Sequence, residues 1–539
     1  MYTLKKHAHA RVLRFQLVDS RGFVEKEDLP QAVYKSQPQS GGGLYTMSEG
    51  DFPKFNTEYL AGMANLDYRA LAKVILSSFD WGISRDELAA IIDEAYGEQW
   101  SKPSGNDWYS KDTTPVKHIG EGLYSLHLGY GPTMAFKNVA LEFLPRFLDA
   151  IIEKLTRRGT KAKVHHVLGA SSGDTINAAH FGVKGTENIK SIFMLPERDA
   201  RTGKGPSEVQ ALQATHGLMN NPNALTLLVD VPFDPAQDVI KALNGEGFSS
   251  FKQEYGITSF NSINIARILA QTVYYFRAYT ELIKQGVITS GEEVVFSVPS
   301  GNFGDALAGM YAKYMGLPIK IHVATNENDV LDEFIKTGRY APREEQKVFI
   351  SNAPSQDIAK SSNLERAIFL ACGGDQAKIN QWYNVDLKNK GYFEVDAETR
   401  RNIQSIFSSS KSTNEQRLGT IQEFLDLYGH PIETHTATAA TPTIDGTLAD
   451  HQRAGTPIVI LETSHHAQFR RELSDSGIIL PEDGEFQATI DAMRKAEPEE
   501  GVHYLRLNLK DLSPEARIEK VRRAVETAAT DIFPKRNVN

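Results

Sequence analysis

The chain has 539 residues, of which 41% are hydrophobic and 24% charged, so it can bury a large core and we expect more than one globular domain. Lys and Arg number 59 and Asp and Glu 68, a net charge of −9, and no dense basic cluster predicts a nucleic-acid partner. The single cysteine, Cys372, excludes an internal disulfide and a zinc framework built on cysteines.

The N-terminal residues MYTLKKHAHARVLRF lack the apolar stretch and cleavage pattern of a secretory signal, and no run of 18 apolar residues follows. We therefore expect a cytoplasmic protein without membrane association. The weakly basic start up to Asp19 leaves an organellar transit peptide open as the alternative.

Residues 1–115 predict a mostly helical N-terminal unit. Apolar residues recur at helical spacing over 66–79, and the sequence S-R-D-E from Ser84 is a capping box that predicts a helix start. The polar stretch SKPSGNDWYSKDTTP then indicates a domain boundary.

Beyond residue 115, short apolar runs alternate with helical ones, the pattern of βαβ units and parallel sheets. We expect two α/β domains, a smaller one at 116–290 and a larger one at 291–539, with ligands at the carboxyl ends of the strands and in a cleft between the domains. Polar helices are predicted over 399–407 and 414–428, and a helical tail over 514–527. The predicted strands are 164–168, 192–195, 225–231, 294–298, 319–323 and 458–461.

The segment GPTMAFKN (131–138) places Lys137 at the entrance of a predicted helix. Its apolar neighbours could desolvate the amine, which would lower its pKa and favour the neutral form that Schiff-base chemistry needs. The alternative is a surface lysine whose stem lies along the helix flank. Pro145 predicts either a kink in this helix or its true first turn.

The segment LGASSGDT (168–175) joins a predicted strand to a predicted helix. Free N–H groups at such a helix start bind anions, and Ser171, Ser172 and Thr175 add hydroxyl donors. One alternative is an ordinary capped helix start. Another is the G-x-S-x-G nucleophile elbow of a hydrolase, which also needs an acid and a histidine elsewhere.

Two further segments suit phosphate. VPSGNFGD (298–305) follows an apolar run and precedes a helix, so it is typical of a phosphate cradle or, alternatively, of a tight glycine turn. In NSINIAR, three-residue steps could align Asn261, Asn264 and Arg267 on one helix face, where the arginine could bind phosphate or simply face solvent. Neither a Walker A loop nor G-x-G-x-x-G occurs, so nucleotide binding is not favoured.

Neither histidine nor cysteine patterns indicate a catalytic metal or thiol. The pairs His165-His166 and His465-His466 lack the H-E-x-x-H pattern or an evident acidic partner, so we expect ordinary buried or hydrogen-bonded histidines and no metal. Cys372 lies in no pattern typical of a thiol protease.

Taken together and in this order, these segments resemble the threonine synthase family, pyridoxal 5′-phosphate (PLP) enzymes of the tryptophan synthase β-subunit fold, PLP fold type II. GPTMAFKN is similar to the family's Schiff-base lysine segment, SSGDT to its substrate loop, NSINIAR to its substrate-phosphate segment and VPSGNFGD to its cofactor-phosphate loop. GGGLY, IHVATNENDVLDEFIKTGRY and APSQDIAKSSNLERAIF also resemble family segments. The resemblance implies two α/β domains with parallel sheets beside the helical N-terminal unit.

The resemblance also implies roles for individual residues. Lys137 would bind PLP covalently and then move protons, and Thr463 in LETSHHAQF would be the hydroxyl partner of the pyridine nitrogen. The residues that would bind the PLP phosphate are Ser300, Gly301, Asn302, Phe303 and Gly304. Those that would bind the substrate carboxylate or the phenolic edge of the cofactor are Ser171, Ser172, Asp174 and Thr175. Asn261 and Arg267 would bind the substrate phosphate.

The reaction that the resemblance implies converts O-phospho-L-homoserine and water to L-threonine and phosphate, in a monomer or homodimer. The chain departs from the family's usual residues at Asn138, Ile176, His466 and Gln468, where an aspartate, a small residue, a proline and a lysine are common. Two alternatives therefore stay open: another fold type II PLP lyase acting on a phosphorylated or free hydroxy amino acid, and a non-catalytic threonine-synthase-like binding protein.

Overall fold

The computed structural model divides the chain into two compact units. Unit 1 combines Met1–Ile92, Asp112–Gly129 and Ser262–Pro481, and unit 2 combines Asp93–Lys111, Tyr130–Asn261 and Glu482–Asn539. These units interleave along the chain, unlike the continuous predicted domains 116–290 and 291–539, because each parallel sheet takes strands from distant segments. The structure describes residues 16–38, 40–97, 112–157, 164–171, 173–197, 206–231, 233–258, 260, 262–344, 347–481, 490–491 and 504–533.

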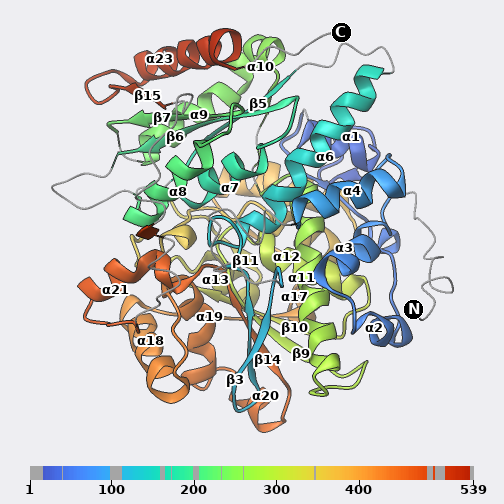
Figure 1. Ribbon diagram of the computed structural model, residues 1–539. Helices are drawn as coiled ribbons and strands as arrows, with labels where there is room; N and C mark the ends of the chain where they lie inside the picture. Colours follow the sequence, from blue (N-terminus) through green and yellow to red (C-terminus); the bar gives the residue numbers. More distant parts are fainter. Residues whose placement is uncertain are drawn as a thin grey trace. The chain divides into compact units, whose positions relative to one another are not determined.

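Within these described residues, unit 1 carries a six-stranded sheet in the order β13-β10-β9-β14-β4-β3 (Figure 1). The first five run parallel, and β3 pairs antiparallel with β4 at the edge. The register of β14 and β4 sets Glu462 beside His127 where both strands end. The strands are β3 (Val116–Gly120), β4 (Leu123–His127), β9 (Val294–Pro299), β10 (Ile319–Thr325), β13 (Phe407–Lys411) and β14 (Ile458–Glu462).

Helices and two small antiparallel pairs complete unit 1. One pair joins β1 (Val18–Asp19) to β2 (Tyr45–Thr46), and the other joins β11 (Arg339–Tyr340) to β12 (Phe393–Glu394). The helices are α1 (Leu29–Lys35), α2 (Thr57–Met63), α3 (Tyr68–Leu76), α4 (Arg85–Ala95, which crosses the limit at Ile92), α11 (Ile265–Lys284), α12 (Gly304–Tyr314), α13 (Val330–Thr337), α14 (Leu364–Ala371), α15 (Gln376–Asn380), α16 (Leu387–Lys390), α17 (Ala397–Ile406), α18 (Asn414–Tyr428), α19 (Thr434–Ile444), α20 (Ala449–Arg453) and α21 (Arg470–Asp475).

Among the described residues, unit 2 carries a five-stranded parallel sheet in the order β15-β7-β6-β5-β8. Its strands are β5 (His165–Ala170), β6 (Ile189–Pro196), β7 (Ala224–Val229), β8 (Ile257–Thr258) and β15 (Tyr504–Leu507). Its helices are α6 (Lys137–Arg157), α7 (Asp174–Gly182), α8 (Glu208–Leu218), α9 (Phe233–Asn244), α10 (Ser249–Tyr255) and α23 (Pro514–Thr527). Figure 1 shows α7 and α8 on the opposite side of this sheet from α23.

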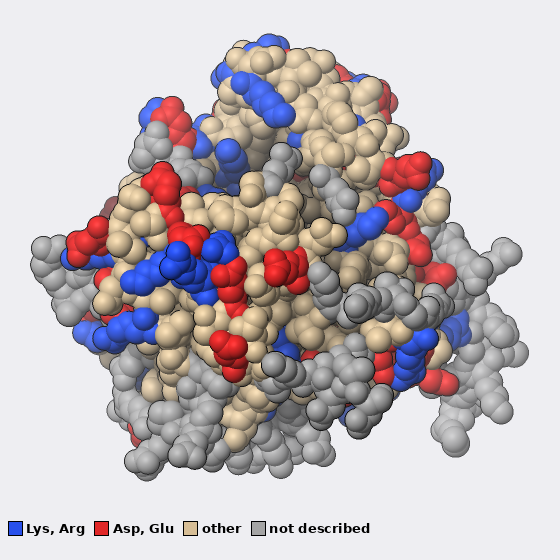
Figure 2. Space-filling view, turned by 90° about the horizontal axis from the view of Figure 1, so that it is seen from above, with Lys and Arg blue, Asp and Glu red and all other residues tan. Residues whose placement is uncertain are grey.

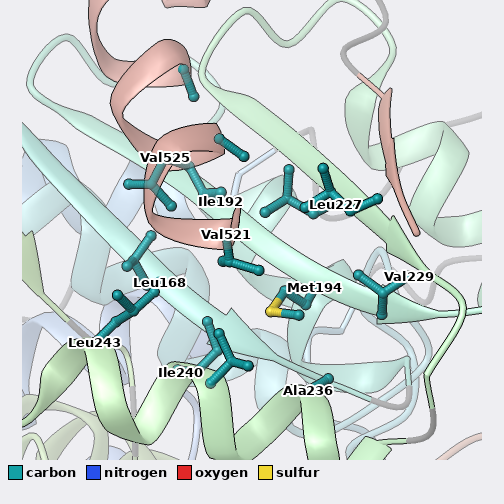
Figure 3. Close-up of a cluster of buried hydrophobic side chains, with 14 of the residues drawn as sticks. Leu168, Ile192, Met194, Leu227, Val229, Ala236, Ile240, Leu243, Val521 and Val525 are labelled. Atoms are coloured by element: carbon teal, nitrogen blue, oxygen red, sulfur yellow. The ribbon is translucent and has the colours of Figure 1, made fainter. Parts of the chain in front are cut away.

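Helices α9 and α23 pack against the sheet of unit 2 through a cluster of buried hydrophobic side chains (Figure 3). Leu168 and Met194 of the strands face Leu243 of α9 and Val521 and Val525 of α23. Each such buried side chain contributes about 1.5–3 kcal/mol relative to an exposed one. The C-terminal helix, predicted from its charge pattern, is therefore part of the core of unit 2.

The predicted helix that begins at Lys137 continues through Pro145 as α6, so Pro145 does not mark its first turn. A proline leaves the carbonyl four residues earlier without its helical hydrogen bond, here that of Leu141. Gly182 of α7 packs on this carbonyl so closely that a Cβ there would lie 1.9 Å from Leu141 O. The glycine thus lets α7 approach α6 at the proline.

All six predicted strands are confirmed, and α18 and α23 have the predicted limits. The capping box at Ser84 is also present, because Glu87 N donates to Ser84 Oγ and Ser84 N to Glu87 Oε2. The parallel sheets with their covering helices confirm the predicted α/β fold class. No helix of the described residues is long and apolar enough to cross a membrane. Figure 2 shows Lys and Arg side chains interspersed with Asp and Glu on one face.

Candidate active site

Lys137 is the first residue of α6 and is half-buried, with its amine 5.5 Å from the centre of the Phe136 ring. The preceding turn contains Met134 in the left-handed region, at φ 57°. Asn138 closes that turn, because its Oδ1 accepts hydrogen bonds from Thr133 N at 2.9 Å and Thr133 Oγ1 at 2.5 Å. The lysine therefore projects from a helix start that side-chain bonds hold in place.

The predicted substrate loop follows β5 and leads into α7. Ser171 is buried, its N–H donates to Met194 O, and its Oγ accepts the N–H of Gly173. Gly173 has φ 149°, and a Cβ there would lie 2.6 Å from the Gln210 side chain, so the turn requires glycine. Thr175 is half-buried in the first turn of α7, which begins at Asp174. Ser172 lies outside the described residues.

Ile176 is one of the departures from the family pattern, and its burial gives a reason for it. Its side chain is 0% exposed, so it fills the interior of unit 2 behind the loop. The larger residue at this position is therefore accommodated in the core of unit 2.

The predicted phosphate loop, Ser300 to Gly304, joins β9 to α12. Ser300 N donates to Ala324 O on the neighbouring strand, and Phe303 caps α12 in the left-handed conformation with its ring packed on Phe407. A Cβ on Gly301 would lie 3.2 Å from Gln356 Cα. The loop thus delivers the free N–H groups of a helix start, where an anion is favoured.

One buried polar atom of this loop tests whether it fits a phosphate. Within the part of the chain that the structure describes, Ser300 Oγ has no hydrogen-bond partner. A buried hydroxyl without a partner is costly, and a phosphate oxygen would accept its hydrogen bond. The residues present therefore fit the phosphate of PLP.

Arg366 was not predicted as a site residue, and it links three of the family-like segments. It is fully buried, and it donates to Tyr45 O at 2.8 Å, Asn363 Oδ1 at 2.7 Å and Ile263 O at 2.5 Å. Asn363 in turn donates to Asn302 O in the phosphate loop, through its N–H at 3.1 Å. An arginine inside the apolar helix LERAIFLA was the one available signal.

Arg267, in the first turn of α11, is only 6% exposed, so the surface-arginine alternative is wrong. Burial lowers its pKa to about 10, which still leaves it charged near neutral pH. Asn264 does not share this position, because its Oδ1 caps α11 through Ala266 N and its Nδ2 donates to Val33 O. Asn261 lies outside the described residues.

Thr463 directly follows β14 and is 7% exposed. The adjoining chain passes so close that a Cβ on Gly129 would lie 2.5 Å from His465 N. Gln468 is also buried and accepts a hydrogen bond from Ser464 Oγ at 3.1 Å. At the second departure in this segment, His466 is half-buried and stacks on His465, with 4.2 Å between ring centres.

A buried ionic cluster, His127, His430 and Glu462, adjoins Thr463 and was not predicted. His127 Nδ1 lies 2.9 Å from Glu462 Oε2, and His430 Nε2 lies 2.5 Å from Glu462 Oε1. Burial alone would raise the pKa of Glu462, but the two histidines hold it well below its usual range. Ser125 Oγ occupies the second nitrogen of His127 at 2.7 Å. Both histidines bond Glu462, so we interpret the three side chains as a hydrogen-bonded ion cluster.

Asp305, next to the phosphate loop, is a further buried acid. It accepts hydrogen bonds from Tyr274 at 2.6 Å and Tyr275 at 2.8 Å, both on α11. Burial raises the pKa of Asp305 to about 6, although the two phenols partly offset the effect. These bonds fix α12, which carries the phosphate loop, against α11, which carries Arg267.

Comparison with known proteins gives one consistent family. Over 439 residues the chain is 36% identical to threonine synthase of Methylobacillus glycogenes, covering 79% of this chain and 85% of that one. It is 34% identical over 462 residues to threonine synthase of Corynebacterium glutamicum, covering 84% and 89%. The crystal structure of PLP-bound threonine synthase from Brucella melitensis matches with a TM-score of 0.79 at 29% identity, covering 94% and 99%. No family model matches the chain. At this identity and coverage, the chain belongs to the threonine synthase family.

Proposed function

We propose that the chain is a PLP-dependent threonine synthase, a carbon–oxygen lyase that converts O-phospho-L-homoserine and water to L-threonine and phosphate. Membership of the family supports this activity. The structural observation that carries it is the loop from Ser300 to Gly304, which leads into α12 and contains a buried hydroxyl that has no hydrogen-bond partner among the described residues. Bound PLP supplies the electron sink that stabilises carbanions next to the amino group.

Each predicted residue has a role in this proposal. Lys137 binds the cofactor covalently and, once released, holds and moves the proton at the reacting carbons. Ser300 Oγ and the N–H groups of Gly301 to Gly304 bind the phosphate of PLP. The hydroxyl of Thr463 pairs with the pyridine nitrogen without imposing a charge on it.

The substrate is bound at two ends in this proposal. Ser171, Ser172, Asp174 and Thr175 bind its carboxylate, or the phenolic edge of PLP, at the start of α7. Arg267 and Asn261 bind its phosphate, and the burial of Arg267 strengthens this interaction because little water competes for the guanidinium. No metal takes part in the proposed reaction.

A second candidate is another fold type II lyase acting on a phosphorylated or free hydroxy amino acid. Gln468 favours it, because a buried neutral amide stands where the family commonly has a lysine that could lie near the substrate phosphate. For either activity we propose a cytoplasmic monomer or homodimer with a small-molecule substrate.

The test incubates the PLP-loaded protein with O-phosphohomoserine and measures phosphate and threonine together. Equal amounts of both are expected, whereas phosphate with a keto acid would indicate the second candidate. Lys137→Ala should abolish both products. Lys154→Ala is the matched control, because it removes a lysine from the last turn of the same helix and should leave both products unchanged.

A further inference from the structure

The side-chain amide of Asn138, next to Lys137, lies between two donors and one acceptor. Its Oδ1 accepts from Thr133 N and Thr133 Oγ1, and its Nδ2 donates to Glu142 Oε1 at 3.5 Å. Asn138 is 0% and Glu142 2% exposed, so water does not substitute for these bonds. Both functions of the amide are therefore used.

An aspartate could not make the same set of bonds. Its carboxylate could accept from Thr133 but has no hydrogen to give to Glu142. Two carboxylates would then face each other without water, and one of them would have to take up a proton. A neutral amide at 138 and a carboxylate at 142 are thus matched to each other.

The charge of Glu142 is balanced within unit 2. Arg146 Nη1 lies 2.8 Å from Glu142 Oε2, and Arg146 Nε lies 3.1 Å from Glu94 Oε1. Arg146 also donates to Gly182 O at 3.2 Å. A negative side chain at position 138 would add a second buried charge beside Glu142, with no second cation to balance it. Burying an unbalanced charge in the protein interior costs free energy.

We propose that Asn138 is a positioning residue for Lys137, whose amide joins the Thr133 turn to Glu142 inside α6 and so fixes the helix start that carries the lysine. The inference deepens the proposed function, since it rests on the covalent bond between Lys137 and PLP. It also gives the departure from aspartate at this position a physical reason.

The test uses a double variant, Asn138→Asp with Glu142→Gln, which exchanges the amide and the carboxylate between the two positions and leaves the net charge unchanged. Asn138→Asp alone should lower the midpoint of thermal unfolding of the cofactor-free protein by about 4 °C or more near neutral pH. The loss should grow as the pH rises, because the folded protein must keep a proton that the unfolded chain has released. Adding Glu142→Gln to Asn138→Asp should restore at least half of the loss, because the new amide can donate to the new carboxylate.

A second measurement reports on Lys137 itself. The visible absorbance of bound PLP is titrated with pH, and the bond to Lys137 is trapped by borohydride and located by mass spectrometry. Asn138→Asp should move the pH midpoint by about one unit, because the side chain that holds the start of α6 changes its partners and with them the surroundings of the bound nitrogen. The double variant should return it toward the wild-type value. If Asn138→Asp fails to fold, Asn138→Ala serves as the second variant. It should still slow the borohydride trapping of PLP on Lys137, but its loss of thermal stability should not depend on pH.

Matched controls separate positioning from general damage. Asn188 makes the same kind of bond in unit 2, its Nδ2 donating to Asp149 Oδ1 at 2.8 Å, so Asn188→Asp should lower stability without moving the PLP midpoint. Glu281→Gln breaks an equivalent pair with Arg277 four residues away on α11 and should also leave the midpoint unchanged.

The inference is overturned if the double variant is as damaged as Asn138→Asp, or if the controls move the PLP midpoint equally. It is also overturned if wild-type Lys137 does not bind PLP. Normal trapping at Lys137 without threonine formation would instead contradict the proposed reaction and leave the positioning role intact.

Discussion

Unit 1 buries Glu462 at the end of β14, and unit 2 buries Glu142 on α6. The two glutamates differ in how strongly their surroundings favour the ionised carboxylate. Glu462, before Thr463, has one histidine for each carboxylate oxygen, and its pKa lies well below the usual range although burial opposes this. Glu142, behind Lys137, has its pKa raised by burial, which Arg146 and Asn138 only partly offset.

The difference lies in how completely the partners satisfy the carboxylate. Both histidines bond Glu462 at short range, whereas Arg146 is shared with Glu94 and the bond from Asn138 is long, at 3.5 Å. A buried charge is kept where every oxygen has a close donor. The weaker arrangement belongs to α6, the helix that begins at the proposed cofactor lysine.

The largest effect is expected for Glu462→Gln, which keeps an acceptor for only one of the two histidines, sets an amide N–H₂ against the other and removes the negative charge. It should cost about 3–5 kcal/mol of unfolding free energy near neutral pH. Because the folded pKa of Glu462 is depressed, its contribution is present above the unfolded pKa and is lost as the pH falls through the folded value. Urea unfolding at neutral and acid pH measures this. An equal loss at both would contradict the ionised cluster.

Glu142→Gln should cost less, about 1–3 kcal/mol, because Arg146 keeps Glu94 as a partner. Its pH dependence should have the opposite sign. Burial raises the pKa of Glu142 in the folded protein, so the wild type loses stability as the pH rises from the pKa of the unfolded chain toward that of the folded protein. The cost of Glu142→Gln should therefore shrink over this pH range. The same unfolding series tests this, and parallel pH profiles for the two glutamate variants would show that the two carboxyl groups do not differ in their tendency to ionise.

Substitution of either histidine of the cluster should lower the free energy of unfolding by an amount that depends on pH. This pH dependence should differ between His430 and His127 by about 1 kcal/mol. Burial would lower the pKa of His430, but Glu462 raises it above the ordinary value; burial lowers the pKa of His127 despite Glu462. The stability that His430 adds is complete below its unfolded pKa and is lost as the pH rises through the folded one. His430→Gln should therefore cost more in mild acid than in mild base, and His127→Gln should show the reverse.

The smallest effect on folding is expected for Ser300→Ala, because Ser300 Oγ is buried and has no hydrogen-bond partner among the residues that the structure describes. Stability of the cofactor-free protein should be unchanged or slightly higher, because an unpaired buried hydroxyl is removed. PLP should bind about tenfold more weakly through the loss of one hydrogen bond to phosphate. Calorimetry without cofactor and a PLP binding titration give the two values; unchanged PLP affinity would remove Ser300 from the proposed phosphate site.

The sequence predicted the elements whose signals are local. Strands such as 294–298 and 319–323 are continuous apolar runs between turns, and Ser84 carries a complete capping box, so neither depends on distant residues. The edge strand β3 and strand β4 were not predicted. The alternation VKHIG in β3 is short, and the pairing of β4 with β14 comes from the far side of the chain.

The site was predictable where chemistry lies within one loop, and not where it depends on contacts across the sequence. Ser300 to Gly304 could be read as a cradle because a helix start follows it directly. The ion cluster at Glu462 draws on His127 and His430, and Arg366 draws on Tyr45 and Ile263, so no single window contains either group. Asn138 could be seen as a departure, but its match to Glu142 required the hydrogen bonds.

The strand order of unit 1 also sets a schedule for protein synthesis. β4 leaves the ribosome early, yet its parallel partner β14 lies near residue 460, and most of the chain has to be translated between them. Pairing of such distant strands is slow, since a long loop must close before any contact is gained. Until then the strand LYSLH, which is buried along its whole length in the folded protein, has an unpaired edge, so nascent chains stalled before β14 are expected to depend on chaperones far more than chains released after it.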